Sequence, residues 1–239
     1  MDTFYLEVGG VKFPFPHQYL DENDIVKHLN HPQVFIDSWK KFFRPGDVVL
    51  DIGGYIGIVS VHLALMGGIV HTFEGSPRNI ERLKGICSPL RQITVHGVAL
   101  HSVGKKCRTR FNDCISREHP EQEIKYVVFD EYAKDIPDPA FVKMDIEGME
   151  SMALLGMKKL LDARPIWQIE CHRGIPWNYS DYPGFVEKED GGFDFNTFYD
   201  FDYKIFSTSW ELVTPEDMKC FENYFFVPNE KKINPRILL

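Results

Sequence analysis

The ten residues VVLDIGGYIG, Val48 to Gly57, decide the fold. Val48 to Ile52 is a short, almost wholly apolar run, typical of a strand buried on both faces of a parallel sheet. Gly53 and Gly54 follow, and the run from Gly57 to Met66 has the pattern of a helix. Glycines at such a turn let the backbone pass close to a ligand, and a helix N-terminus offers free N–H groups and a positive dipole. The stretch therefore predicts a nucleotide-type binding loop, although a tight turn without a ligand has the same pattern.

Outward from this loop, apolar runs and helical patterns alternate along the chain. Strands are expected at Ile69 to Phe73, Ile93 to Leu100, Phe141 to Met144 and Ile166 to Cys171, with helices at Pro77 to Cys87 and Met149 to Leu161. Strands that alternate with helices form βαβ crossovers. The fold class predicted is α/β, with a doubly wound, mostly parallel sheet.

Composition narrows the class of protein. The chain has 239 residues, 44% of them hydrophobic and 26% charged, which excludes collagen-like, disordered and disulfide-scaffold classes. The net charge of −8 argues against a nucleic-acid partner, because that affinity comes from clustered positive charge. No apolar run is long enough for a membrane span, and the five cysteines are scattered. The first ten residues have no basic region followed by an apolar stretch, so we do not expect a secretory signal. We expect a cytoplasmic protein with reduced thiols and no membrane partner.

The flanking segments suggest additions to one domain. Residues 1–44 are expected to form a cap, with a hairpin of Phe4 to Val8 and Val11 to Phe15 followed by two short helices within Asp21 to Phe43. Residues 45–239 would form the main domain. Ser102 to Lys125 is ambiguous, and Arg173 to Gly192 is long enough to be a functional loop. A helix at Phe193 to Phe201 and strands at Tyr203 to Thr208 and Asn223 to Val227 are expected to end the chain.

Glu74 closes the second strand about twenty residues after the glycine loop. An acid at this position can accept hydrogen bonds from both hydroxyls of a ribose, as in other nucleotide-binding α/β folds. The alternative interpretation is a solvated carboxylate at a strand end. Together, the loop and this acid at this spacing favour nucleoside binding.

Two further motifs place acids at strand ends. In VKMDIEGME, residues 142–150, Asp145 ends a strand and Glu147 and Glu150 lie near a helix start. Glu150 is best explained by helix capping, whereas Asp145 and Glu147 favour a site. In QIECH, residues 168–172, Glu170 and His172 are two residues apart, so an extended chain points both to one face. A carboxylate beside an imidazole suits a general base, or half of a metal site.

These motifs together resemble a known family. DIGGYIG (51–57), FEGSPRNIERL (73–83), FVKMDIEGMESMALLGMKKLL (141–161) and PIWQIECH (165–172) are similar to the FkbM family of S-adenosylmethionine-dependent methyltransferases. The resemblance covers roughly residues 48–172 and, more loosely, the last strand pair. It implies a seven-stranded, Rossmann-like class I methyltransferase sheet whose last strand is antiparallel. The chain departs from the family at Gly54-Tyr55, where Ala-Asn is usual, and at Gly75, where Pro is usual.

The resemblance implies an O-methyltransferase that uses S-adenosyl-L-methionine on a hydroxyl of a sugar, glycan or related small metabolite. The expected catalytic residues are His172, as base, with Asp145 and Glu170. The expected cofactor-binding residues are Asp51, Gly53, Gly54, Tyr55, Gly57, Glu74, Ser76 and Asp145. A divalent metal is not favoured; if one is present, its expected ligands are Asp145, Glu147 and Glu170.

Alternatives stay open at this point. The acceptor atom could be nitrogen rather than oxygen, or the chain could be a non-catalytic module that keeps the methyltransferase fold. A nicotinamide-dependent oxidoreductase is disfavoured, because the adjacent glycines do not form the G-x-G-x-x-G fingerprint. Four aromatic residues in the long loop, Trp177, Tyr179, Tyr182 and Phe185, suggest a wall that stacks on a ring, or a loop packed by its own aromatics. The oligomeric state is not predicted.

Overall fold

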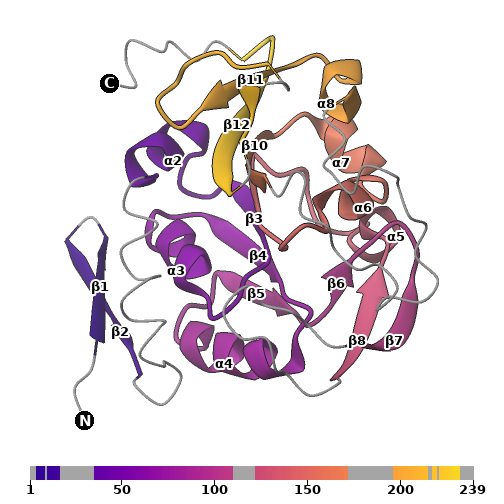
Figure 1. Cartoon of the computed structure of the whole chain (residues 1–239). Coiled ribbons are helices and arrows are strands. Elements are labelled where there is room, and N and C mark those ends of the chain that lie inside the picture. The colour runs from indigo at the N-terminus through magenta and orange to yellow at the C-terminus, as the bar shows by residue number, and fades with distance from the viewer. Residues whose placement is uncertain are drawn as a thin grey trace.

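A computed structural model of the chain describes residues 4–8, 10–16, 35–109, 122–171, 196–214, 217–219 and 221–231. Its centre is a seven-stranded sheet with the order β11-β12-β10-β9-β3-β4-β5 (Figure 1). The strands are β3 (Val48–Ile52), β4 (Ile69–Phe73), β5 (Ile93–His96), β9 (Phe141–Met144), β10 (Ile166–Cys171), β11 (Tyr203–Ser207) and β12 (Glu222–Pro228).

The strand directions confirm the predicted doubly wound, mostly parallel sheet. β3, β4, β5, β9 and β10 pair in parallel, whereas β12 is antiparallel to both β10 and β11. From β3 the chain proceeds to β4 and β5 on one side, and later adds β9 and β10 on the other. The strand order therefore reverses between β3 and β9, and ligands of open α/β sheets bind outside the carboxyl ends of the strands at such a point.

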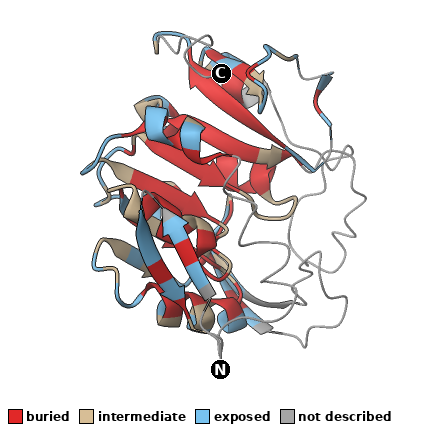
Figure 2. Ribbon diagram, turned by 90° about the vertical axis from the view of Figure 1, so that its left-hand side faces the viewer, coloured by how far each residue is buried: buried red, intermediate tan, exposed pale blue. Residues whose placement is uncertain are grey.

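Helices cover both faces of this sheet. One core contains alternate strand residues, such as Leu50 and Met144, and packs against α5 (Phe129–Tyr132), α6 (Glu150–Leu154), α7 (Lys158–Ala163) and α8 (Asn196–Asp200). The opposite core contains Val49 and Phe141 and packs against α2 (Ile36–Phe42) and α3 (Ile58–Leu65). Figure 2 shows the result, with the central strands coloured almost entirely as buried. Burial on both faces explains why these strands read as continuous apolar runs.

The predicted N-terminal hairpin is present as β1 (Phe4–Val8) and β2 (Val11–Phe15), paired antiparallel. Leu6, Phe13 and Phe15 form a third apolar cluster with residues of α3 and α4 (Pro77–Cys87). The hairpin therefore packs on the helices that follow the glycine loop (Figure 1). The division of the chain at residue 44 stays a prediction.

Two predicted elements are each divided in the structure. The single strand expected from Ile93 to Leu100 is instead β5 and β6 (Ala99–Leu100), because the chain turns where the Val98 N–H donates to the His96 carbonyl. β6 joins a second sheet of order β6-β8-β7, with β7 at Lys105–Thr109 and β8 at Gln122–Val127. The helix expected from Met149 to Leu161 is α6 and α7, separated by a turn at Gly156, where an added Cβ would lie 2.6 Å from the His101 carbonyl oxygen.

Some sequence predictions fall outside the described residues. Of the two helices expected within residues 21–43, the described part contains α2, and residues 17–34 are not described. The long loop at residues 173–192, with its four aromatics, also lies outside. Within the described residues, Cys87 is a buried free thiol. No helix in the described part of the chain has the length and hydropathy needed to cross a membrane.

Candidate cofactor and catalytic site

The glycine loop lies at the carboxyl end of β3, where the strand order reverses, and α3 follows it. Gly53 and Gly57 have positive φ values of 89° and 94°, in the region that favours glycine. The N–H groups of Gly53 and Gly54 both donate to the Phe73 carbonyl, at 2.9 and 3.0 Å, which holds the loop against the end of β4. A Cβ on Gly57 would lie 2.9 Å from both the Cys87 Sγ and Leu83. These glycines are therefore required by the close packing of the loop.

Tyr55 continues this unusual backbone, with a φ of 48° in the left-handed region although it is not a glycine. Asparagine, which the family usually has here, adopts this conformation more readily than an aromatic residue. The Arg82 guanidinium lies 5.7 Å from the centre of the Tyr55 ring, a cation–π distance. The loop thus has a left-handed backbone at Tyr55 although the residue is aromatic.

Glu74 fastens the loop from the neighbouring strand. Its Oε2 accepts the N–H of Tyr55 and its Oε1 accepts the N–H of Ser76, each at 2.8 Å. The side chain is buried, so the interpretation of Glu74 as a solvated strand-end acid is wrong. Ser76 stands immediately before α4, so one carboxylate links the glycine loop to the start of the next helix.

The ionisation of Glu74 reflects this environment. Burial raises the pKa of Glu74 to about 7, and hydrogen bonds from Ser76, Tyr55, Asn79 and Gly75 oppose the rise. A carboxylate has about four lone-pair directions, and the short bonds from Ser76 and Tyr55 use two of them. The other two directions face the Asn79 side chain and the Gly75 N–H, which lower the pKa of Glu74 less. A ribose would therefore bind Glu74 by replacing these two donors with its hydroxyls.

Asp51, the last acid before the loop, is completely buried. Its Oδ2 accepts the Ser60 hydroxyl at 2.5 Å, and its Oδ1 has no hydrogen-bond partner among the described residues. Burial raises the pKa of Asp51 to about 6, and the nearby Lys143 ammonium lowers it. Ser60 was not predicted; its only sequence signal is its place on the first turn of the helix after the loop.

Lys143 is the functional candidate that sequence reasoning missed. In the sheet register it stands between Asp51 on β3 and Gln168 on β10, so the three side chains share the face covered by α2 and α3. Its Nζ lies 3.1 Å from Asp145 Oδ2. A lysine in the middle of a buried strand was the available signal, because lysine is almost never fully buried without a partner.

The acids of the VKMDIEGME motif have three different roles. Asp145 follows β9 and pairs with Lys143. Glu150 caps the backbone as predicted: its Oε1 accepts the N–H groups of Ile146 at 3.1 Å and Gly148 at 3.3 Å. Glu147 has a positive φ of 57° in the tight turn between β9 and α6.

Glu170 and Asp145 end neighbouring strands. The register pairs Ile169 with Met144, so Glu170 and Asp145 follow at adjacent positions on the other face, the face of Lys143. His172, the predicted base, lies outside the described residues. The structure therefore brings Asp145 and Glu170 to the same edge but does not test the carboxylate–imidazole pair.

The three acids expected to bind a metal, if one is present, do not form a metal site in the described part of the chain. Among the described residues, which include Asp145, Glu147 and Glu170, there is no group of three or more His, Cys, Asp or Glu side chains arranged to hold a metal ion. Asp145 instead faces the ammonium of Lys143.

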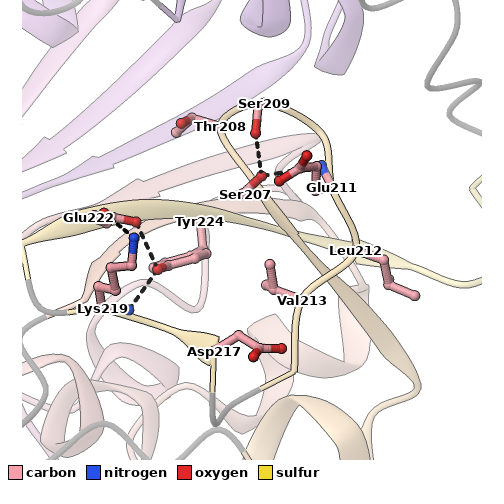
Figure 3. A pocket seen from close by; sticks show the side chains of 10 residues that line it. All are labelled: Ser207, Thr208, Ser209, Glu211, Leu212, Val213, Asp217, Lys219, Glu222 and Tyr224. Atoms are coloured by element: carbon pink, nitrogen blue, oxygen red, sulfur yellow. Dashed lines mark hydrogen bonds and ion pairs between the residues drawn. The ribbon is translucent and has the colours of Figure 1, made fainter.

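A cavity of about 410 Å³ opens at the same edge of the sheet, beside the last strand pair (Figure 3). Its wall is largely polar, and its side chains bond to one another: Tyr224 donates to Glu222 at 3.1 Å, Lys219 lies 3.6 Å from Glu222, and Ser207 and Ser209 are hydrogen-bonded. Because β12 and β10 separate it from β9, the cavity is distinct from the glycine loop.

Comparisons with solved structures show several methyltransferases. Precorrin-6y C5,15-methyltransferase from Geobacter metallireducens has 12% identity and a TM-score of 0.46, covering 89% of this chain and 94% of its own. Fibrillarin from Aeropyrum pernix, solved with natively bound S-adenosyl-L-methionine, has 11% identity and a TM-score of 0.46. The match covers 94% of this chain and 81% of fibrillarin. A TehB-like methyltransferase from Corynebacterium glutamicum has 13% identity and a TM-score of 0.44. The match covers 81% of this chain and 87% of the TehB-like protein. No curated protein matches the sequence.

The family model described as the methyltransferase FkbM domain matches residues 51–195, more than half of the chain. The matched region begins at the acid before the glycine loop. It includes Glu74, the Lys143–Asp145 pair and Glu170. This chain belongs to the FkbM family of S-adenosylmethionine-dependent methyltransferases.

Proposed function

We propose that this protein transfers a methyl group from S-adenosyl-L-methionine to a hydroxyl group of a sugar, glycan or related small metabolite. The observation that carries the proposal is the glycine loop at the strand-order reversal, fastened by Glu74 to the end of β4. Ligands of open α/β sheets bind outside the strand ends at such a reversal, and Glu74 lies there as an acid that can accept hydrogen bonds from the ribose of an adenosine cofactor. Glu74 would hold the ribose, and Gly53, Gly54 and Gly57, which pack closely against the protein, would give the loop the shape that receives the rest of the cofactor.

The acids at the ends of β9 and β10 support a hydroxyl group as the methyl acceptor. When bound, the cofactor supplies an activated methyl group, and the transfer is an in-line displacement at that carbon. The protein must then orient the acceptor and remove its proton. Asp145 and Glu170 end adjacent strands at this edge, and His172 follows Cys171, the last residue of β10, in the sequence. We assign proton removal to His172, and orientation of the acceptor to Asp145 and Glu170.

The charge of the chain is consistent with this class of acceptor. With a net charge of −8, the protein would repel a polyanionic acceptor such as a nucleic acid, whereas a neutral sugar or phenol meets no such barrier. We therefore keep a small molecule or glycan as the proposed partner. The scattered cysteines, typical of reduced thiols, support the cytoplasm as the proposed location.

The first experiment is calorimetric titration of the purified protein with S-adenosylmethionine and S-adenosylhomocysteine. Binding of both is expected, and no binding of either at millimolar concentration would overturn the proposal. The second is transfer of an isotope-labelled methyl group to a panel of sugars, phenols and amines, read by mass spectrometry. Transfer to amines alone would replace oxygen by nitrogen as the acceptor atom, and cofactor binding without any transfer would favour a non-catalytic module.

On an acceptor found in this way, His172→Ala should lower turnover by about 10²- to 10⁴-fold, the contribution typical of a general base. Affinity for S-adenosylhomocysteine should stay near that of the wild type. Turnover by His172→Ala within twofold of the wild type would remove His172 from the proposed role.

A further inference from the structure

Lys143 is a buried cation surrounded by acids. It projects from the middle of the sheet, and its Nζ contacts Asp145 Oδ2 at 3.1 Å. Burial lowers the pKa of Lys143, but attraction to the carboxylates of Asp145, Asp51 and Glu170 outweighs burial and raises it above the ordinary value. The ammonium is therefore charged, and its counterions come from β3, from the residue after β9 and from β10.

Among the described residues, the helices packed over this face bring no other buried positive charge to the acids, because Lys40 and Lys41 of α2 are exposed. On α3, the buried His62 has its pKa lowered to about 4 by burial, so it is neutral, and its Nδ1 bonds to the Ile58 carbonyl. On α2, Trp39 donates its Nε1–H to Gln168 at 2.6 Å. Gln168 in turn donates to Asn223 at 2.9 Å, so the neighbour of Lys143 in the register is a neutral amide.

Asp51 depends most on this cation. Its Oδ1 is fully buried and has no hydrogen-bond partner among the described residues, and Lys143 is the one cation that lowers its pKa. A buried carboxylate without a counterion is strongly unfavourable. Lys143, the register neighbour of Asp51, therefore stabilises the ionised form of Asp51.

Lys143 is also connected to the loop through Asp145. The Asp145 N–H donates to the Ile52 carbonyl at 2.9 Å, and the Asp145 carbonyl oxygen lies where a Cβ of Gly53 would be. The position of the Asp145 backbone therefore limits the position of the loop backbone. The Lys143–Asp145 ion pair, by fixing Asp145, therefore also limits the position of the loop at Gly53.

We infer that Lys143 is a positioning residue whose ammonium holds Asp51, Asp145 and Glu170 in place at the strand-order reversal, a role that a divalent cation would otherwise have to fill. This inference rests on the proposed function where it concerns cofactor binding, and on the fold alone where it concerns the acids. No side chain other than lysine or arginine would supply a permanent charge at this depth.

The test uses the full chain and S-adenosylhomocysteine as the probe. Lys143→Met removes charge and donor, whereas Lys143→Gln keeps a donor without charge. Lys204→Met, the same change at an exposed position on β11, is the matched control. Both Lys143 variants should bind at least about tenfold more weakly than wild type, since a buried carboxylate loses its counterion, and the control should bind normally. Chelation by EDTA, with or without added Mg²⁺, should leave wild-type binding unchanged.

A third variant separates charge from folding. Lys143→Ala leaves space for a small alkylammonium ion, so propylammonium at tens of millimolar should raise its melting temperature, whereas 1-propanol should not. Neither additive should raise the melting temperature of the wild type. This arm decides the question if Lys143→Met and Lys143→Gln do not fold.

Three results would overturn the inference. These are wild-type affinity in Lys143→Met, loss of wild-type binding on chelation with recovery on Mg²⁺ addition, or no specific response of Lys143→Ala to propylammonium. Failure of the wild type to bind either cofactor form would instead overturn the proposed function, and the propylammonium experiment would still test the role of Lys143.

Discussion

The α-carbon of Gly53 lies directly against the carbonyl oxygen of Asp145, so close that an added Cβ would come within 1.7 Å of that oxygen. Gly53 follows β3 and Asp145 follows β9, and the two residues meet where the strand order reverses. The contact joins the β3-β4-β5 half of the sheet to the half that begins with β9 through backbone atoms. A larger residue at position 53 would have to separate β3 from β9.

The first prediction follows from this contact. Gly53→Ala should destabilise the protein by about 3 kcal/mol or more, because it combines a clash with backbone and a positive φ of 89°. Chemical denaturation measures the change. Gly104→Ala is the control, since the nearest atom to its added Cβ is the Tyr126 carbonyl oxygen at 3.8 Å. Equal stability of both variants would contradict the described loop.

The second prediction concerns Glu74. Glu74→Ala leaves the N–H groups of Tyr55 and Ser76 without their acceptor, so unfolding free energy should fall by about 1–3 kcal/mol for each buried donor left unpaired. Affinity for S-adenosylhomocysteine should fall as well, because the loop loses its support and the ribose its acceptor. Denaturation and calorimetry measure the two effects.

Glu81→Ala, at an exposed position on α4, is the matched control for loss of a carboxylate. It should match the wild type in both measurements. If Glu74→Ala lost affinity but kept full stability, the two backbone hydrogen bonds would contribute little, and Glu74 would act on the ligand alone.

The third prediction is a pH dependence of cofactor binding. Burial raises the pKa of Glu74 to about 7 in the free protein. Ribose hydroxyls donate to the ionised carboxylate, so binding should lower this pKa, and a proton should be released when the ligand binds below pH 7. Affinity for S-adenosylhomocysteine should therefore be highest above pH 7 and fall by up to about tenfold per pH unit below it. A flat profile between pH 6 and 8 would mean that the ligand does not use the carboxylate.

The pattern of the fold was largely predictable because its signals are local. Buried parallel strands appear as short apolar runs, and Gly53, Gly57 and Glu74 mark the loop by their spacing alone. The two divided elements were not predictable from periodicity. The first is divided by a local turn at His96 to Val98, after which β6 leaves the main sheet and pairs with the distant β8. The second is divided at Gly156, which lies in the turn between α6 and α7 against the carbonyl of His101, a residue far away in the sequence.

The site was predictable in its outline and not in its electrostatics. Acids at strand ends were found at Asp145 and Glu170, since a strand end is visible in the sequence. The counterion was missed because Lys143 appears in the sequence as one polar residue in an apolar run, and two of the three acids that attract it lie on other strands. The attachment of Glu74 to the loop was also missed, because it requires the left-handed backbone at Tyr55.

The fourth prediction uses the buried His62. Its pKa is about 4 in the folded protein, below the ordinary value of 6.5, because burial disfavours the charged form. A lowered histidine pKa means that its contribution to stability is complete above pH 6.5 and is lost as the pH falls from 6.5 toward 4. The loss should reach about 3 kcal/mol.

Denaturation of the wild type and His62→Leu at pH 7.5 and pH 4.5 isolates this contribution. Asp51 and Glu74 have raised pKa values and so act in the opposite direction over the same range, which is why the comparison must be between variants. The variant should lose less stability than the wild type on acidification. An equal loss in both proteins would assign the acid sensitivity to other groups.

The last prediction concerns the departure of this chain from its family at Gly54. A Cβ on Gly54 would lie 2.1 Å from the Thr72 hydroxyl oxygen on the neighbouring strand, and that oxygen is buried without a hydrogen-bond partner among the described residues. Gly54→Ala, the residue usual in the family, should therefore cost about 1–3 kcal/mol of unfolding free energy through overpacking. Thr72→Ala removes the obstructing oxygen, so the double variant should recover most of that loss. A double-mutant cycle with a coupling energy of at least about 1 kcal/mol is expected, since residues in contact are rarely additive. Strict additivity of the two single variants would show that Thr72 does not limit the size of residue 54, and the choice of glycine there would need another cause.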